Sequence, residues 1–372
     1  MAAEDGNASK LGFGMMRLPE KDGEPDLKTV CRMADAFLEG GMNYIDTAYV
    51  YHRGKSETAV GETVVKRYPR DAFLLATKLP IWEMNGKEDR DRIFSEQLER
   101  TGAGFFDYYL LHSIEDENIE KYEGLDCFSW GLQKKREGLI RHFGFSFHGS
   151  PELLDRLLDQ YSETEFVQIQ LNYADWDNPI VQSGKLCGIL QKRGIPMIIM
   201  EPVKGGSLAK LKPELEEKLR AVRPEASIAS WAFRFAASLP GVMTVLSGMS
   251  DMEQMEDNLA TFRNLEPMNP LERETLTEVT RIMLSIPQIG CTSCRYCCDG
   301  CPEDIPIPDV FRALNTMRIY GDTFRPKALY RNATEEHGKA SDCIACGQCE
   351  GVCPQHLPVI ELMKEAAGKL EN

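Results

Sequence analysis

The feature that most constrains the fold of this chain is a regular alternation of strand-like and helix-like segments between Leu11 and Leu246. Short apolar runs predict eight strands, at residues 11–16, 42–45, 73–77, 108–111, 142–146, 166–171, 197–200 and 242–246. Between them, apolar residues recur every three or four positions, as in helices that pack one face on a sheet. These helices are predicted at 27–39, 56–67, 89–100, 127–136, 151–161, 181–192 and 227–237, and 211–222 is predicted as an additional helix after the seventh strand.

Eight strands alternating with helices match the pattern of a (β/α)8 barrel, whose typical length is about 250 residues. The alternative is an open, doubly wound parallel sheet, which normally carries a G-x-G-x-x-G loop after its first strand. The segment Leu11-Gly12-Phe13-Gly14-Met15-Met16 has the first two glycines and lacks the third. The sequence therefore favours an α/β fold of the TIM-barrel type.

Two cysteine loops near the C-terminal end share the spacing C-x2-C-x2-C-x3-C-P, the first ending at Cys301-Pro302 and the second at Cys353-Pro354. This is the spacing of bacterial [4Fe–4S] loops. A disulfide framework has no reason to repeat it, and zinc sites normally use separate C-x2-C pairs. The loops predict two [4Fe–4S] clusters as metal centres.

In two-cluster ferredoxins the fourth cysteine of each loop binds the other cluster. The predicted ligand sets are Cys291, Cys294, Cys297 and Cys353 for one cluster, and Cys343, Cys346, Cys349 and Cys301 for the other. Cys298 is out of spacing and is predicted to be a packed thiol. Helical patterns at 308–319, 323–330 and 358–370 indicate a small, mostly α-helical ferredoxin-like domain. We place the domains at 1–286 and 287–372, with Pro287 at the boundary.

Composition limits the partners of the chain. The formal net charge of −15 excludes nucleic acid as an expected partner, because nucleic-acid binding requires a basic face. There is no signal segment and no apolar run of membrane-spanning length, so we expect a cytoplasmic protein with no membrane partner. Dispersed free cysteines also favour a reducing compartment. An electron-transfer protein, if one docks, is expected to present a basic patch.

Polar, titratable residues stand where three successive predicted strands end. Asp46 follows the second strand, Lys78 the third and His112 the fourth, while Tyr51 lies in the loop after Asp46. In a barrel of this type the strand ends and the following loops meet at one face, which is where active sites lie. The alternative is a buried Asp46–Lys78 ion pair beside a packing tyrosine.

These residues lie in motifs that resemble the aldo-keto reductase family, and the C-terminal loops make the whole chain similar to its iron–sulfur-containing branch. The motifs are Gly41–Glu57, Thr77-Lys78, Leu110-Leu111-His112, Gly138–Ser146 and Glu201–Gly206. The resemblance implies that Asp46, Tyr51, Lys78 and His112 form a catalytic tetrad. His52 stands where the family usually has a glycine.

The resemblance also implies a bound nicotinamide cofactor. Its carboxamide would be held by Ser146, Gln168 and Asn172, its pyrophosphate by Val203, Gly205, Gly206, Gly248 and Ser250, and its adenosine end by Gln254 and Asn258. The stretch 244–261 contains no lysine or arginine for a 2′-phosphate. Both NADPH and NADH therefore remain open.

The chemistry of the four residues suits carbonyl reduction, in which the oxygen must gain a proton. A nearby lysine lowers the pKa of a phenol, so Lys78 is expected to activate Tyr51 as general acid and base. Asp46 would keep Lys78 charged, and a neutral His112 would hydrogen-bond the substrate oxygen. We expect reversible reduction of an aldehyde or ketone, or oxidation of an alcohol, with electron transfer through the clusters. The alternative is an electron carrier or redox sensor whose barrel binds a nucleotide without turnover.

Overall fold

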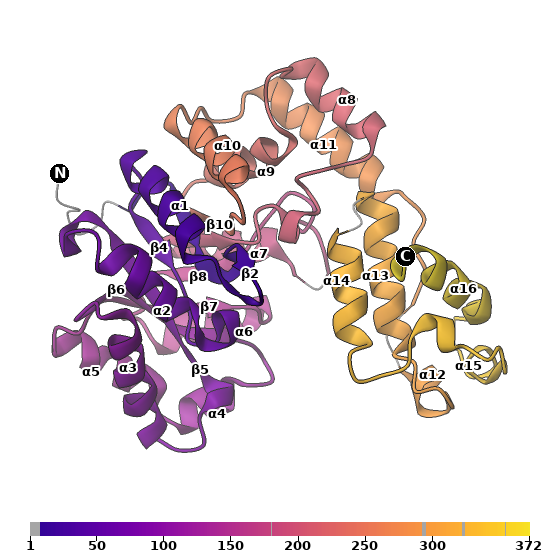
Figure 1. Ribbon diagram of the computed structural model, residues 1–372, viewed down its shortest axis with the longest axis horizontal. Coiled ribbons are helices and arrows are strands. Elements are labelled where there is room, and N and C mark those ends of the chain that lie inside the picture. The colour runs from indigo at the N-terminus through magenta and orange to yellow at the C-terminus, as the bar shows by residue number, and fades with distance from the viewer. Residues whose placement is uncertain (1–7, 180, 292–294, 322–323, 354) are drawn as a thin grey trace. The chain divides into compact units, whose positions relative to one another are not determined.

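The computed structural model describes residues 8–179, 181–291, 295–321, 324–353 and 355–372. The chain divides into two compact units: the first comprises Met1–Pro202 and Ala232–Met268, and the second Val203–Trp231 and Asn269–Asn372 (Figure 1). A segment that follows the seventh barrel strand thus groups with the C-terminal residues. The domain boundary predicted after residue 286 stays a prediction.

Eight parallel strands close a barrel in the first unit, as the sequence predicted. In order around the barrel they are β1 (Leu11–Gly14), β10 (Val242–Ser247), β9 (Met197–Met200), β8 (Val167–Gln170), β7 (Ile140–Phe147), β6 (Phe106–Ile114), β5 (Leu74–Pro80) and β4 (Tyr44–Asp46). The main difference from the prediction is β6, which continues to Ile114 and so contains His112. Its residue His112 stands opposite Pro80 of β5 in the parallel register.

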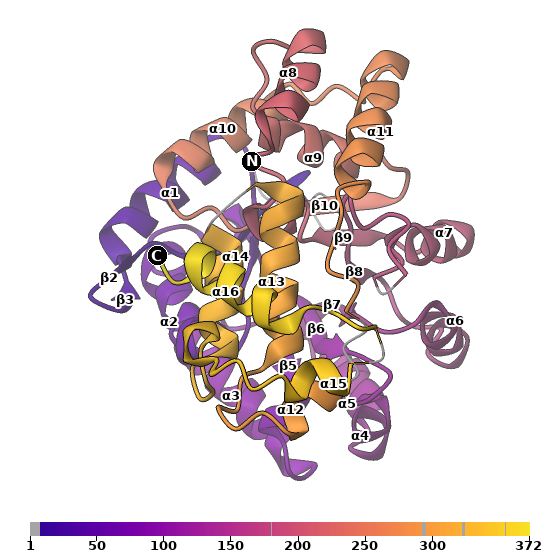
Figure 2. The same cartoon turned by 90° about the vertical axis from the view of Figure 1, so that its right-hand side faces the viewer.

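Helices surround these strands in both views of the molecule (Figures 1 and 2). They are α1 (Leu27–Glu39), α2 (Ser56–Val60), α3 (Glu88–Thr101), α4 (Ile119–Gly124), α5 (Cys127–Arg136), α6 (Pro151–Gln160), α7 (Ser183–Arg193), α9 (Ile228–Ala237) and α10 (Met252–Arg263). Helix α6 begins as its sequence predicts, because Ser150 accepts a hydrogen bond from the amide of Leu153 and Pro151 takes the first helical position. Helices α4 and α10 were not predicted, and neither was the short hairpin of β2 (Glu20–Lys21) and β3 (Glu24–Pro25).

The helix predicted over 56–67 is interrupted in the structure. Helix α2 ends at Val60 and continues as a wider π-type turn over Gly61–Val65. A side chain at Gly61 would bring its Cβ to 2.7 Å from the carbonyl oxygen of Arg100. Glycine therefore allows this turn to lie directly against the end of α3.

The barrel interior is filled with side chains. The buried cluster consists of Tyr44, Leu74, Ala76, Tyr108, Leu110, Phe166, Ile198 and Leu246. Its members come from β4, β5, β6, β9 and β10, together with Phe166 immediately before β8. Because this core is packed rather than open, a reaction site is expected at the C-terminal ends of the strands.

The second unit is helical, which confirms the predicted mostly α-helical domain. Its helices are α8 (Pro213–Val222), α11 (Pro270–Leu284), α12 (Tyr296–Asp299), α13 (Ile307–Tyr320), α14 (Phe324–Ala333), α15 (Gln348–Gly351) and α16 (Val359–Leu370). Helix α8 lies beside α11, and α13 lies beside α14 and α16 (Figures 1 and 2). Arg223, just after α8, pairs with buried Glu272 of α11 at 2.9 Å. None of the helices in the described ranges combines the length and apolar character needed to cross a bilayer.

Candidate active site and cysteine pocket

Three strands and one loop bring the four predicted catalytic residues together. Asp46 ends β4, Lys78 and His112 lie in β5 and β6, and Tyr51 begins a 3-10 turn after β4. The Lys78 Nζ lies 2.6 Å from Asp46 Oδ1 and 4.9 Å from the centroid of the Tyr51 ring. The rings of Tyr51 and His112 meet edge to face with 5.8 Å between centroids. These contacts form one continuous site.

Lys78 and Asp46 form a fully buried ion pair. Burial alone would lower the pKa of Lys78, but the negative charge of Asp46, the neighbouring Tyr51 and the hydrogen bonds to both raise it overall. The Nζ also donates a hydrogen bond of 2.8 Å to the carbonyl oxygen of Thr47. Lys78 is therefore an ammonium held in a fixed position. The buried Asp46–Lys78 ion pair, which the sequence offered as the alternative to a catalytic site, is present and lies beside Tyr51 in the same site.

The pKa of Tyr51 departs from the sequence expectation. Burial raises it by more than the nearby Lys78 lowers it, and Asp46 adds to the rise, so the net direction is upward. The sequence predicted a lowered value because it considered the ammonium without the desolvation. Tyr51 is consequently a protonated phenol at neutral pH, which is the form that can donate a proton.

His112 is a neutral imidazole. Burial, followed by the positive charge of Lys78, holds its pKa well below the ordinary value of 6.5. Among the described residues, its Nδ1 has no hydrogen-bond partner. The indole of Trp82 lies 5.0 Å from the imidazole, centroid to centroid, and is 48% exposed. Trp82 is thus an exposed aromatic neighbour of His112, a contact that the sequence did not suggest.

His52, next to Tyr51, ties the catalytic loop to the loop after β1. Its Nε2 accepts a hydrogen bond of 3.0 Å from the amide of Leu18, so its Nδ1 carries the proton that Glu20 accepts at 3.0 Å. The φ angles of His52 and Arg53 are 51° and 57°, in the left-handed region that favours glycine. The histidine therefore keeps the backbone conformation that a glycine would adopt and adds two anchoring bonds.

Two of the residues predicted to hold a nicotinamide carboxamide are partners in the strand register, Ser146 of β7 and Gln168 of β8. Ser146 Oγ accepts a hydrogen bond of 2.7 Å from the amide of Ser113. The buried Gln168 Oε1 has no partner in the described part of the chain, so it is free to accept from a ligand amide. The third, Asn172, already donates to Asp175 at 2.8 Å and to the carbonyl of Glu201 at 3.1 Å.

The loop after β10 contains Gly248 and Ser250, predicted at the phosphates, and helix α10 contains Gln254 and Asn258, predicted at the adenosine. Ser250 donates from its hydroxyl to the carbonyl of Arg17 at 2.9 Å, and its amide donates to Gln254 Oε1 at 2.9 Å. Asn258 is buried and bonds Ser247 Oγ at 2.8 Å. A Cβ at Gly248 would lie 3.2 Å from the Arg17 Cδ.

Arg17 is a functional candidate that the sequence reasoning missed. It comes from the turn after β1, far along the chain from Gly248, and it pairs with Glu201 at 3.6 Å. The sequence showed no cation within 244–261, but the fold brings this one beside that stretch. In the second unit, the predicted pyrophosphate residues Val203, Gly205 and Gly206 lie at a 3-10 turn over Lys204–Gly206.

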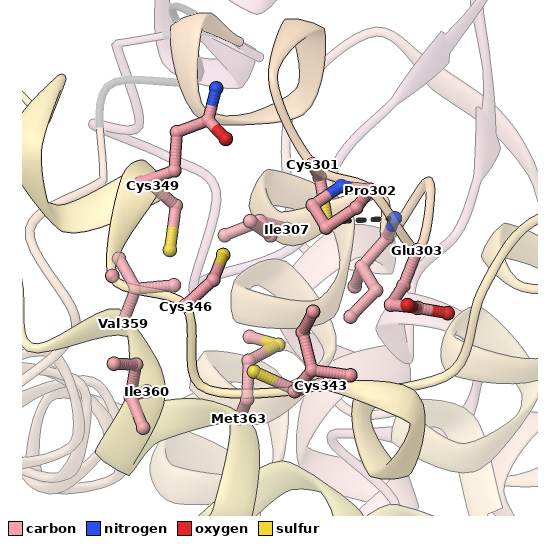
Figure 3. Close-up of a pocket in the computed structure, with 14 residues that line it drawn as sticks. Cys301, Pro302, Glu303, Ile307, Cys343, Cys346, Cys349, Val359, Ile360 and Met363 are labelled. Atoms are coloured by element: carbon pink, nitrogen blue, oxygen red, sulfur yellow. Dashed lines mark hydrogen bonds between the residues drawn. The ribbon is translucent and has the colours of Figure 1, made fainter.

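One pocket of the second unit is lined by four predicted cluster ligands. Cys301 comes from the first cysteine loop, whereas Cys343, Cys346 and Cys349 come from the second (Figure 3). Ile307, Val359 and Met363 supply apolar walls, and the amide of Ile305 donates to the Cys301 sulfur at 3.5 Å. Four cysteine side chains in an apolar pocket with an N–H···S bond suit a [4Fe–4S] cluster, which would bind them as thiolates.

The other predicted ligand set is only partly described. Cys294 lies outside the described residues, and Cys291, Cys297 and Cys353 are partly buried. Burial, with additions from Cys298 and Cys291, raises the pKa of Cys297 to about 12. Within the described residues, no three histidine, cysteine or acidic side chains are already close enough to hold a single metal ion. Both ligand sets stay predictions.

Comparison with known proteins agrees with this arrangement. A relative from Bacillus subtilis, the uncharacterized oxidoreductase YqkF, is 25% identical over 75% of this chain and 96% of its own length. L-galactose dehydrogenase of Arabidopsis thaliana is 26% identical over 74% and 90%. The NADH-specific methylglyoxal reductase of Escherichia coli is 24% identical over 70% and 91%.

Solved structures share the fold. An aldo-keto reductase from Klebsiella pneumoniae in complex with NADP and acetate covers 76% of this chain and 94% of its own, at 20% identity and a TM-score of 0.60. Residues 290–357 match the 4Fe-4S dicluster domain. Residues 10–280 match the aldo/keto reductase family. The chain therefore belongs to the aldo/keto reductase family and carries a C-terminal 4Fe-4S dicluster domain.

Proposed function

We propose that the barrel catalyses the reversible, nicotinamide-dependent reduction of an aldehyde or ketone. The observation that carries this proposal is the convergence of Asp46, Tyr51, Lys78 and His112 at one end of the barrel. A protonated phenol, a fixed ammonium and a neutral imidazole together suit a carbonyl oxygen that must gain a proton. Membership of an oxidoreductase family supports the same reaction class.

In the proposed reduction Tyr51 donates its proton to the carbonyl oxygen, and in oxidation the phenolate accepts it back. Lys78 stabilises the phenolate that forms, because its ammonium lies close to the Tyr51 ring. Asp46 holds that ammonium in place through the bond of 2.6 Å. His112 hydrogen-bonds the substrate oxygen without competing for the proton, since it stays neutral.

A nicotinamide bound at this site would supply the hydride that no side chain can provide. Ser146 and Gln168 would hold its carboxamide, and the unpaired Gln168 Oε1 is the atom that best fits the amide N–H groups. Arg17 is our candidate cation for the phosphates, because it lies against Gly248. The named relatives include an NADH-specific reductase and an NADP complex, so both nucleotides are to be tested.

For the C-terminal domain we propose two [4Fe–4S] clusters that exchange single electrons with a partner protein. Cys343, Cys346 and Cys349 would hold one together with Cys301 of the other loop. Cys291, Cys294, Cys297 and Cys353 would hold the second. The support for the crossed arrangement is that Cys301 lines the same pocket as the three cysteines of the second loop.

The experiment is an anaerobic assay of the holo-protein with NADPH or NADH and a panel of small aldehydes and ketones. We expect nucleotide oxidation that depends on the added carbonyl and yields one alcohol per nucleotide consumed. Nucleotide binding without alcohol formation, accompanied by reversible cluster reduction, would instead support the electron-carrier alternative and overturn the proposal.

A further inference from the structure

Two neighbouring residues at the start of α2, Ser56 and Glu57, are connected to Lys78 through hydrogen bonds of other residues. Ser56 is connected to the side-chain ammonium of Lys78, and Glu57 to its backbone carbonyl. Both are fully buried, and neither contacts the ammonium directly in the hydrogen bonds described above. One works through the carbonyl that accepts from Nζ, and the other through the backbone of β5. Their effect on Lys78 is therefore indirect and depends on two short chains of hydrogen bonds.

The Ser56 chain ends at the ammonium. Ser56 Oγ donates to the carbonyl of Met15 at 2.9 Å, which leaves its lone pairs to accept from the Thr47 hydroxyl at 2.8 Å. The carbonyl of the same Thr47 accepts from Lys78 Nζ at 2.8 Å. Ser56 thus fixes the residue that, with Asp46, orients the ammonium toward Tyr51.

The Glu57 chain ends at the Lys78 backbone. Glu57 Oε1 accepts from the Thr77 hydroxyl at 2.7 Å and from Gln97 Nε2 at 2.8 Å. The same Gln97 nitrogen lies 3.0 Å from the Lys78 carbonyl and donates to it. Glu57 therefore holds both the residue before Lys78 and the amide that contacts Lys78 itself.

The charge of the Glu57 carboxylate is paired with Arg100, and hydrogen bonds fix its position. Its Oε2 accepts from Arg100 at 3.2 Å, and the hydroxyl of Tyr109 locks Gln97 through a bond of 2.6 Å to Oε1 of that residue. Gly61 permits the close approach of this turn to the end of α3, which carries Gln97 and Arg100. A buried carboxylate with every contact satisfied is costly to replace, even by an isosteric amide.

We propose that Ser56 and Glu57 are positioning residues that set the location of the Lys78 ammonium relative to Tyr51. The catalytic consequence of this inference rests on the proposed function, in which Lys78 stabilises the Tyr51 phenolate. It adds two residues that touch neither substrate nor cofactor. Small displacements of a catalytic group are known to cost on the order of 100-fold in rate.

The test compares Glu57→Gln with the matched control Asp107→Asn in the holo-protein. Asp107 is also fully buried, and it accepts from Arg70 at 2.6 Å and Arg141 at 3.0 Å, but it lies at the opposite end of β6. Both variants should melt at a lower temperature. Only Glu57→Gln should lower kcat, by on the order of 10- to 100-fold. The same variant should raise the apparent pKa in the pH profile of alcohol oxidation and leave the nucleotide Kd unchanged.

A second readout does not need turnover. In the protein labelled with ¹⁵N-lysine, the bonded ammonium of Lys78 should give a slowly exchanging NMR signal that Glu57→Gln shifts or broadens and Asp107→Asn preserves. Ser56→Ala, a milder change, should produce the same shift to a smaller degree. If Glu57→Gln and Ser56→Ala both leave the Lys78 signal and the pH profile unchanged, the inference is overturned. Absence of turnover in the unsubstituted protein would refute the proposed function alone, because the NMR comparison would still decide the positioning role.

Discussion

The properties of single residues in the site are set by burial as much as by neighbours. Tyr51 illustrates this, since the ammonium of Lys78 lowers its pKa while desolvation raises it further. The net effect keeps the phenol protonated, and the deeply lowered pKa of His112 keeps the imidazole neutral. In the proposed mechanism proton donation therefore falls to Tyr51, because a neutral His112 carries no extra proton to give.

Replacing Tyr51 with phenylalanine should remove most of the reductase activity. The loss of a general acid typically costs about 10²- to 10⁴-fold in rate. Nucleotide affinity should stay nearly constant, as measured by fluorescence titration beside steady-state kinetics. Tyr49→Phe is the matched control, because its hydroxyl bonds Glu96 on α3 at 2.6 Å. Near-normal kcat in Tyr51→Phe would place the acid elsewhere.

The pH dependence should differ between the two directions. Reduction requires the protonated phenol, and since its pKa is raised above 10.0, kcat for reduction should be flat between about pH 6 and about pH 9. Oxidation requires the phenolate, so its rate should increase with pH over the same range. A reduction profile with a limb near pH 6.5 would show that His112 titrates there and contradict the assignment.

At the scale of elements, the strand order and the convergence of the tetrad followed from sequence because parallel strands end at one face of a barrel. Contacts between loops that are distant in the chain could not be predicted from the sequence. Arg17 beside Gly248, Trp82 over His112 and the bonds of His52 all depend on how loops after different strands fold back. No local spacing encodes such contacts, so the sequence could predict the strand ends and miss the residues that surround them.

The loop after β4 offers a direct measure of backbone strain. In His52→Ala the anchoring bonds are lost and the left-handed conformation persists, whereas His52→Gly loses the bonds and relieves the strain. The glycine variant should therefore be more stable than the alanine variant by about 1 kcal/mol. Chemical denaturation of the barrel, followed by tryptophan fluorescence, measures this difference. Equal stabilities would mean that residue 52 is not held at positive φ in solution.

The two cysteine loops make a prediction about which ligands share a cluster. If Cys301 joins the second loop, Cys301→Ala and Cys346→Ala each remove the same cluster, about four irons. The double variant should then lose no more iron than either single variant, whereas Cys301→Ala with Cys291→Ala should lose both clusters. Iron analysis of anaerobically purified protein decides this. Loss of both clusters in the Cys301/Cys346 double variant would show that each loop binds its own.

At the scale of the whole molecule, the proposed function places a two-electron reaction in the barrel and one-electron transfer in the 4Fe-4S dicluster domain of the same chain. Hydride carries two electrons together, while a [4Fe–4S] cluster normally exchanges one. The segment Val203–Trp231 belongs by sequence to the barrel region and by compactness to the second unit, which also contains the cysteine pocket. This segment includes Val203, Gly205 and Gly206, the residues predicted to hold the pyrophosphate of a nicotinamide cofactor.

The central claim is that the Asp46, Tyr51, Lys78 and His112 site directs hydride to a carbonyl carbon. The most direct test supplies NADPH or NADH carrying deuterium at the reactive carbon of the nicotinamide, together with small aldehydes and ketones, to the anaerobic holo-protein. Mass spectrometry of the alcohol should find one deuterium on the former carbonyl carbon. The label should be transferred from only one face of the nicotinamide. Tyr51→Phe should form labelled alcohol only at its low residual rate. Alcohol without the label, or bleached clusters with no alcohol from either nucleotide, would contradict the account.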